Sequence, residues 1–122
     1  MRQFESLLNS KLTTIEKIYD GGSSGTSLPA SNLTLTKAFT DFSAILIEWY
    51  VGSNRRQCCI RPTDFGVYYY DSFGTYQSNT WYFAKIIFQF PANQDNKKIT
   101  FGSPDVTGWS DSPKLRYIWG IY

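Results

Sequence analysis

The sequence contains no histidine, only two cysteines, and no glycine-rich loop between a predicted strand and a helix. Without an imidazole, serine–histidine and cysteine–histidine nucleophile systems are excluded, and so are most zinc sites. The missing glycine-rich loop excludes the common nucleotide-binding motifs. We therefore expect no cofactor and no metal site, and no catalytic residue of the imidazole-dependent kinds.

The two cysteines, Cys58 and Cys59, are adjacent in the chain. Neighbouring side chains in a strand point to opposite faces, so this pair is badly placed to form a disulfide with itself. We expect one to be buried as a small apolar residue and the other to lie at a surface or an interface. An intermolecular disulfide within an oligomer is the alternative.

The chain also lacks a strong charge and a long apolar run. Its formal net charge is +2, and its basic pairs are Arg55-Arg56 and Lys97-Lys98. Nucleic-acid-binding proteins show a denser basic stripe. No run of about 18 apolar residues is present, and no signal peptide is recognisable. We expect a soluble chain that neither binds nucleic acid nor inserts into a membrane.

Aromatic residues are abundant instead, at 18% of the 122 residues. A high share of aromatic and hydroxyl residues, with little alanine and leucine, favours sheet over helix. The length argues for one domain. About seven or eight short strands, roughly eight to fifteen residues apart, are typical of an all-β antiparallel sandwich, jelly-roll-like in kind.

The strongest strand signal is the stretch 39–52, which we predict to be a central strand. Alternation places one set of apolar residues on a single face: Ile45, Ile47, Trp49 and Val51. The other face carries Leu46 and Tyr50 around one charge, Glu48, so part of it should be covered. An unpaired buried carboxylate is costly, so Glu48 should either meet an arginine or lie near a rim of the sheet. The candidates are Arg56, Arg61 and Arg116.

The remaining strands are predicted from shorter alternating runs, near residues 15–19, 33–36, 55–62, 66–71, 81–90, 98–101 and 115–122. The last of them should place Leu115, Tyr117, Trp119 and Ile121 on one face. Segments 73–79 and 102–113 are predicted to be polar connections. Residues 1–14 are predicted to be a lead-in or stem, helical or irregular, and residues 15–122 the sandwich domain.

Carboxylates are the remaining candidates for catalysis, because a glycosidase needs two acids beside the sugar bond. The candidates considered are Glu48, Asp64, Asp71, Asp105 and Asp111. Most adjoin glycine, serine, proline or threonine, where aspartate commonly bonds its own backbone in a turn. A structural ion pair explains Glu48 more simply than catalysis does. We therefore do not expect an enzyme.

Loop aromatics with polar neighbours are the candidates for ligand binding, because sugars stack on aromatic rings while aspartate and asparagine hold their hydroxyls. Two stretches have this composition, one with Asp105, Trp109 and Asp111 and one with Tyr76 and Asn79 next to Trp81. The alternative is that Trp109 folds back as a lid on the core or packs on a neighbouring subunit.

Apolar residues on both faces of several predicted strands suggest self-association. One small sandwich has a single interior, and extra apolar surface normally marks a contact. A symmetric homo-oligomer is the common solution, and we expect a homotrimer.

The stretch Leu28 to Thr36, followed by Phe39-x-x-Phe42-Ser-Ala-Ile-Leu-Ile-Glu-Trp, resembles the C-terminal domains of bacteriophage tail-fibre and minor structural proteins. The ending Arg116-Tyr-Ile-Trp-Gly-Ile-Tyr122 is similar to the closing strand of that family, with Trp119 in the aromatic place. The resemblance covers about residues 15 to 122. Its motifs are apolar, so they bear on fold more than on role.

This resemblance implies a trimeric β-sandwich of the virion, made in the cytoplasm of a bacterial host. It would project from a tail or capsid and contact a glycan or protein on the host surface. No catalytic residues follow from the resemblance. The leading hypothesis is thus a structural adhesin domain. The alternatives are a carbohydrate-binding module of a larger enzyme and a capsid-decorating scaffold domain without a ligand.

Overall fold

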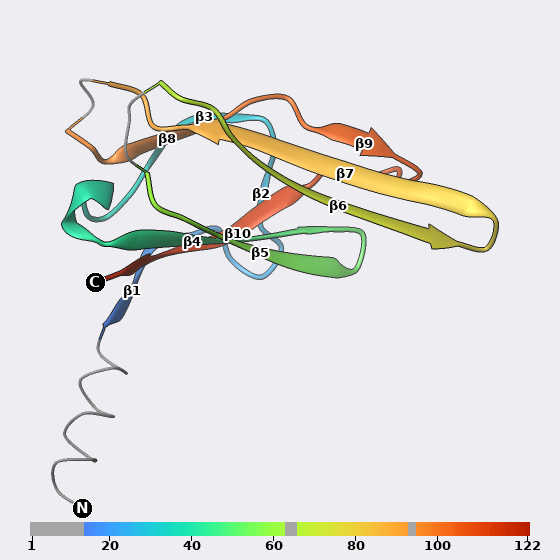
Figure 1. Cartoon of the computed structure of the whole chain (residues 1–122), viewed down its shortest axis with the longest axis horizontal. Coiled ribbons are helices and arrows are strands. Elements are labelled where there is room, and N and C mark those ends of the chain that lie inside the picture. The colour runs from blue at the N-terminus through green and yellow to red at the C-terminus, as the bar shows by residue number, and fades with distance from the viewer. Residues whose placement is uncertain (1–13, 63–65, 93–94) are drawn as a thin grey trace, which may run out of the picture.

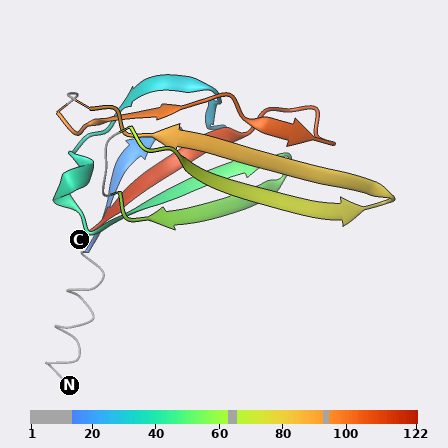
Figure 2. The same ribbon diagram turned by 45° about the horizontal axis from the view of Figure 1, so that its top comes forward.

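A computed structural model describes residues 14–62, 66–92 and 95–122. The predicted lead-in over residues 1–14 lies outside this part except for Thr14, and Asp64 lies outside it as well. The described residues form ten strands and one short 3-10 turn. The strands make two antiparallel sheets that face each other (Figures 1 and 2). The predicted all-β sandwich is therefore confirmed.

Sheet A contains β1 (Ile15–Asp20), β10 (Lys114–Ile121), β4 (Ala44–Val51) and β5 (Asn54–Ile60) in that order, and β2 (Thr26–Ser27) pairs with β10. Sheet B contains β3 (Ala30–Thr34), β8 (Lys98–Phe101), β7 (Thr80–Gln89) and β6 (Tyr69–Gln77), and β9 (Asp105–Thr107) pairs with β7. The late strands β10 and β8 are inserted between earlier ones, as in jelly-roll sandwiches.

The core lies between the inner faces of the two sheets. From sheet A it receives the predicted alternating residues of β4, which are fully buried: Ile45, Ile47, Trp49 and Val51. In the segment 81–90, alternation predicts one face with Tyr82, Ala84, Ile86, Phe88 and Phe90, and the other with Trp81, Phe83 and Lys85. Of the first face, Tyr82 is partly buried, and the core receives the other four from sheet B, all fully buried: Ala84, Ile86, Phe88 and Phe90. Each large apolar side chain buried in this way contributes about 1.5–3 kcal/mol.

One polar contact joins the two sheets inside this core. The indole Nε1 of Trp49 in β4 donates a hydrogen bond to Asp71 Oδ2 in β6 at 2.7 Å. Trp49 is fully buried, so its indole N–H group cannot bond to water. Without Asp71 this N–H group would be left without a hydrogen-bond partner, which is costly. The contact sets the position of β6 relative to β4.

The prediction that Leu115 shares one face of the last strand with Tyr117, Trp119 and Ile121 was wrong. The register of β10 against β4 shifts between Leu115 and Tyr117, which is a β-bulge at Arg116. Leu115 and Ile118 are buried, whereas Trp119 is only partly buried. A bulge adds one residue, so every later side chain changes face relative to a regular strand. Strict alternation from Leu115 therefore fails after Arg116.

Three boundaries also differ from those predicted. The stretch 39–52 begins with the 3-10 turn Phe39–Asp41, and the strand starts at Ala44. β6 runs through Phe73 and Gly74 to Gln77, where a polar connection was predicted. The predicted polar loop 102–113 contains β9, which pairs with β7.

The cysteines lie in β5 as expected. Both are free thiols, Cys58 being packed against the core and Cys59 exposed. Burial, with smaller contributions from Asp71 and Cys59, raises the pKa of the Cys58 thiol to about 11. Since the thiolate is the reactive form, Cys58 is poorly reactive at neutral pH.

Candidate ligand-binding face

The β6–β7 hairpin is the longest pair of strands and extends well past the rest of the sandwich (Figures 1 and 2). Its two-residue turn is Ser78-Asn79, between the paired residues Gln77 and Thr80. Both turn residues have positive φ, 52° and 62°. This is the requirement of a type I′ turn, whose twist matches that of the strands, and asparagine tolerates it well.

Two aromatic rings face solvent next to this turn. Tyr76 and Trp81 are directly opposite each other in the register, and their ring centroids are 4.8 Å apart with the planes tilted by 48°. Trp81 is 68% exposed and Tyr76 is 53% exposed. The Tyr76 hydroxyl donates to Asn79 Oδ1 at 3.5 Å. An indole this exposed gains little from the core and is available for a partner.

The exposed aromatic surface continues along the outer face of the hairpin. Phe83, two residues from Trp81, is 39% exposed, and Tyr70 is 55% exposed. Gly74 lies opposite Phe83 in β6, so no side chain stands beside that ring on the β6 side. We call the surface formed by Tyr70, Tyr76, Trp81 and Phe83 the aromatic face.

A charged pair borders the aromatic face. Lys85 follows Phe83 on the same side of β7 and is in register with Asp105 of β9. Their charged groups are 3.4 Å apart, and the Lys85 ammonium lies 5.2 Å from the centre of the Tyr70 ring. These exposed groups keep their hydrogen-bonding capacity, so they can bind the hydroxyl groups of a ligand that lies across the rings.

The structure brings three of the five predicted site residues to this outer surface: Tyr76, Asn79 and Asp105. Trp109 lies on the inner side of the hairpin. Its ring stacks with Phe73 at 5.9 Å and packs on Tyr82 at 5.2 Å, and it is partly buried against the core. This arrangement matches the alternative of a lid on the core.

Asp111 is exposed in the connection between β9 and β10. The sequence reasoning missed Tyr70, Phe83 and Lys85 as members of the face. The alternation of segment 81–90 already put Phe83 and Lys85 on the side of Trp81. Recognising Ser78-Asn79 as a hairpin turn would have added the residues of β6.

Three of the five candidate carboxylates, Glu48, Asp71 and Asp105, have structural partners. Glu48 forms an ion pair with Arg116 at 3.2 Å, one of the three predicted partners, and its other oxygen accepts a hydrogen bond from Gln57 at 3.2 Å. Asp71 is bonded to Trp49 and Asp105 to Lys85. Within the described ranges no group of three metal-ligating side chains comes together.

No helix among the described residues is long and apolar enough to cross a membrane. No protein-family model, no curated protein and no solved structure matches the chain. Functional inference therefore rests on the geometry above and on the sequence resemblance.

Proposed function

We propose that this domain is a structural adhesin that binds a carbohydrate on its aromatic face, as a receptor-binding part of a bacteriophage fibre. The observation that carries the proposal is the projecting hairpin with its exposed Tyr76–Trp81 pair. A monomeric soluble protein seldom exposes such a contiguous aromatic surface without a partner. The resemblance to phage tail-fibre domains supplies the host-surface setting.

The geometry supports a simple mode of binding. The apolar C–H face of a pyranose ring would lie on Trp81, with Tyr76 beside it. Asn79 at one end of the face and the Lys85–Asp105 pair at the other would bind the equatorial hydroxyls. Binding of this kind breaks no covalent bond in the sugar, so it needs neither a general acid nor a nucleophile. Several copies in one trimer would raise the avidity of a weak single site.

The direct test is a glycan array and a host-cell binding assay with the Trp81→Ala variant. We expect binding to weaken by tenfold or more, since truncating a central aromatic commonly costs about 2 kcal/mol or more. The side chain is mostly exposed, so the fold should be retained, which circular dichroism checks. Val67→Ala serves as the control, because Val67 is also exposed, at 45%, and lies in the connection before β6, outside the aromatic face.

Unchanged binding by Trp81→Ala would contradict the proposed site. Binding by a protein that remains a monomer would favour a carbohydrate-binding module. A trimer without binding to any glycan or cell would favour a scaffold domain. Hydrolysis of a polysaccharide that disappears in Glu48→Gln would overturn the non-enzymatic role.

A further inference from the structure

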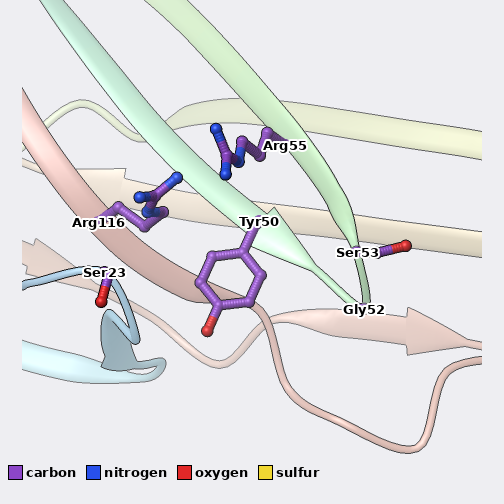
Figure 3. A pocket seen from close by; sticks show the side chains of 6 residues that line it. All are labelled: Ser23, Tyr50, Gly52, Ser53, Arg55 and Arg116. Carbon is purple, nitrogen blue, oxygen red and sulfur yellow. The ribbon is translucent and has the colours of Figure 1, made fainter.

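A concave surface lies on sheet A, the sheet opposite the aromatic face. It is a pocket of about 320 Å³ between the β4–β5 turn, β10 and the loop after β1. Apart from Gly52, its lining residues are polar, basic or aromatic: Ser23, Tyr50, Ser53, Arg55 and Arg116. Figure 3 shows the guanidinium groups of Arg55 and Arg116 pointing toward one another over β4, with the Tyr50 ring below them.

Arg116 is placed here by the bulge in β10. At a bulge two successive side chains can share one side of the sheet, and Arg116 lies 5.0 Å from the centre of the ring of its neighbour Tyr117. Its side chain is only 12% exposed, and its Nε is buried without a hydrogen-bond partner among the described residues. A guanidinium has five N–H donors, so the one ion pair with Glu48 leaves most of them free.

Glu48 cannot neutralise both arginines. One of its oxygens is bonded to Gln57 and the other is paired with Arg116. In the described part of the chain no carboxylate lies within ion-pair distance of Arg55. Two guanidinium groups and one carboxylate leave one net positive charge at the pocket, and the two cations repel each other unless an anion lies between them.

The aromatic wall of the pocket is held in place before any ligand binds. The Tyr50 hydroxyl donates a hydrogen bond of 2.6 Å to the carbonyl oxygen of Ser24. Gly25 lies against the same ring, because a Cβ atom there would approach Tyr50 Cε1 to 3.3 Å. A fixed ring offers a flat surface without losing side-chain freedom on binding.

We propose that this pocket binds an acidic sugar unit, with the acid group held between Arg55 and Arg116. Arginine forks match a carboxylate in bidentate geometry. The volume is at the small end of ligand pockets, which suits one monosaccharide unit. The Tyr50 ring would take the apolar sugar face, and Ser23 would reach a hydroxyl. The site is independent of the aromatic face and adds a charge requirement to glycan recognition.

The test is an NMR titration of the labelled protein with methyl glucuronide, methyl glucoside and inorganic sulfate. We expect amide shifts at Ser23, Gly52 and Ser53 with the glucuronide but not with the neutral glucoside. Arg55→Gln should weaken the glucuronide affinity about tenfold or more, the usual effect of losing a charge-assisted bond. Arg61→Gln changes the net charge equally at an exposed position outside the pocket, and it should leave the affinity unchanged.

Three results would overturn the proposal. Equal losses in Arg55→Gln and Arg61→Gln, or no shifts at the pocket, would show that no anion site exists there. Sulfate binding as tightly as the glucuronide would show a plain anion site without sugar recognition. Because Trp81→Ala leaves this pocket intact, glucuronide binding by that variant separates a failure of this site from a failure of the aromatic face.

Discussion

Gly120 lies directly beneath the ring of Phe42, and a Cβ atom at this position would overlap that ring. Phe42 in turn packs on Tyr122, with ring centroids 4.7 Å apart. A glycine is therefore needed here so that the backbone can approach the Phe42 ring closely. The sequence alone does not indicate that this glycine lies against Phe42. The constraint belongs to tertiary packing and is invisible in the local sequence.

We predict that Gly120→Ala lowers the free energy of unfolding by about 1–3 kcal/mol, the usual cost of overpacking. Urea unfolding followed by tryptophan fluorescence measures this change. Gly74→Ala is the matched control, because its Cβ would meet its nearest atoms at 3.6 and 3.7 Å, which is ordinary contact. Equal stability of the two variants would show that Phe42 moves aside without cost.

The partly buried Cys58 gives a second prediction at this scale. In a Cys59→Ser variant, the remaining Cys58 should react very slowly with a maleimide at pH 8. With a pKa of about 11, only about one thiol in a thousand is ionised there. The rate should rise about tenfold for each pH unit until the pH approaches 11, and immediately on adding denaturant. Fast labelling of the folded protein at pH 8 would contradict the burial of Cys58.

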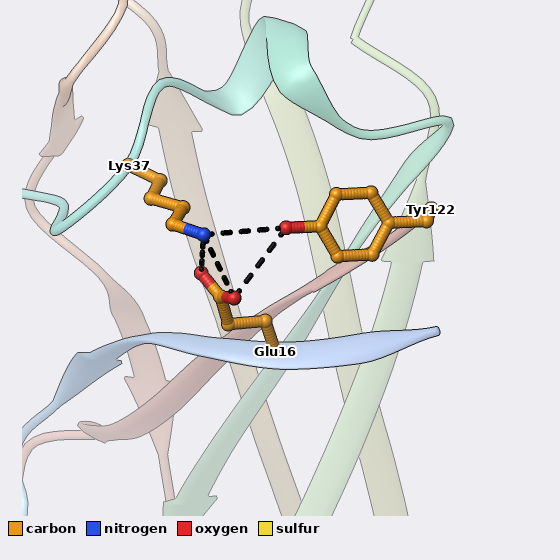
Figure 4. Close-up of polar contacts among 3 residues, drawn as sticks. All are labelled: Glu16, Lys37 and Tyr122. Carbon is orange, nitrogen blue, oxygen red and sulfur yellow. Dashed lines mark hydrogen bonds and ion pairs between the residues drawn. The ribbon is translucent and has the colours of Figure 1, made fainter. Parts of the chain in front are cut away.

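At the scale of elements, the edge strand β1 is tied to the end of the chain by an exposed polar group of three (Figure 4). The ammonium of Lys37 is 2.9 Å from each of the two carboxylate oxygens of Glu16. It also donates to the Tyr122 hydroxyl at 3.5 Å. The hydrogen bond to Glu16, and then that to Tyr122, raises the pKa of Lys37.

We predict that Lys37→Gln lowers the urea midpoint slightly at pH 7, since exposed ion pairs contribute little. A raised pKa in the folded state means that the contribution is complete below about pH 10.5, the unfolded value, and disappears as the pH rises through the folded pKa. The difference from wild type should therefore vanish in strong alkali, and should shrink in 1 M salt. Lys97→Gln, at an exposed position, is the control.

The elements show how far the sequence could be interpreted. The faces of β4 and of segment 81–90 were predicted correctly because uninterrupted alternation and high apolar content define a buried side. β10 was misassigned after Arg116 because a bulge depends on pairing with β4, which no local pattern reveals. β6 was cut short because Gly74 resembles a loop residue. β9 was missed because it has only three residues, with Val106 as its one apolar side chain, which is too short a run to show alternation.

The candidate site was predictable only in part for the same reason. Tyr76 and Asn79 could be selected by composition, as could Asp105. Strand pairing brings Tyr76, Asn79 and Asp105 to one surface and places Trp109 on the other side of β7. Arg55 and Arg116 lie far apart in the sequence, so their convergence in one pocket could not be foreseen from spacing.

At the scale of the whole molecule, apolar side chains remain on the outer side of sheet A. Leu46, Trp119 and Ile121 are partly exposed there, and Trp119 packs on Tyr117 at 5.4 Å. Such residues covering the outer side of a two-sheet sandwich fit a contact between copies. They lie at the end of sheet A where Ile121 pairs with Ala44, whereas the pocket with Arg55 and Arg116 lies toward the other end of the sheet.

We predict a homotrimer, with a mass in light scattering of three times the 14.0 kDa of one chain. Trp119→Lys should reduce the mass to that of one chain, because an unpaired charge would have to be buried in the contact. Trp81→Lys, on the opposite sheet, should leave the mass unchanged. A wild-type mass of 14.0 kDa would contradict the prediction.

The tip of the β6–β7 hairpin stands beyond the sandwich, and all six residues from Tyr76 to Trp81 are exposed. Substitutions there meet no core, so most would cost the fold almost nothing. Evolution can therefore vary these positions rapidly while the sandwich beneath stays constant. A population of such chains could follow a changing target through a few tip mutations, without compensating changes elsewhere.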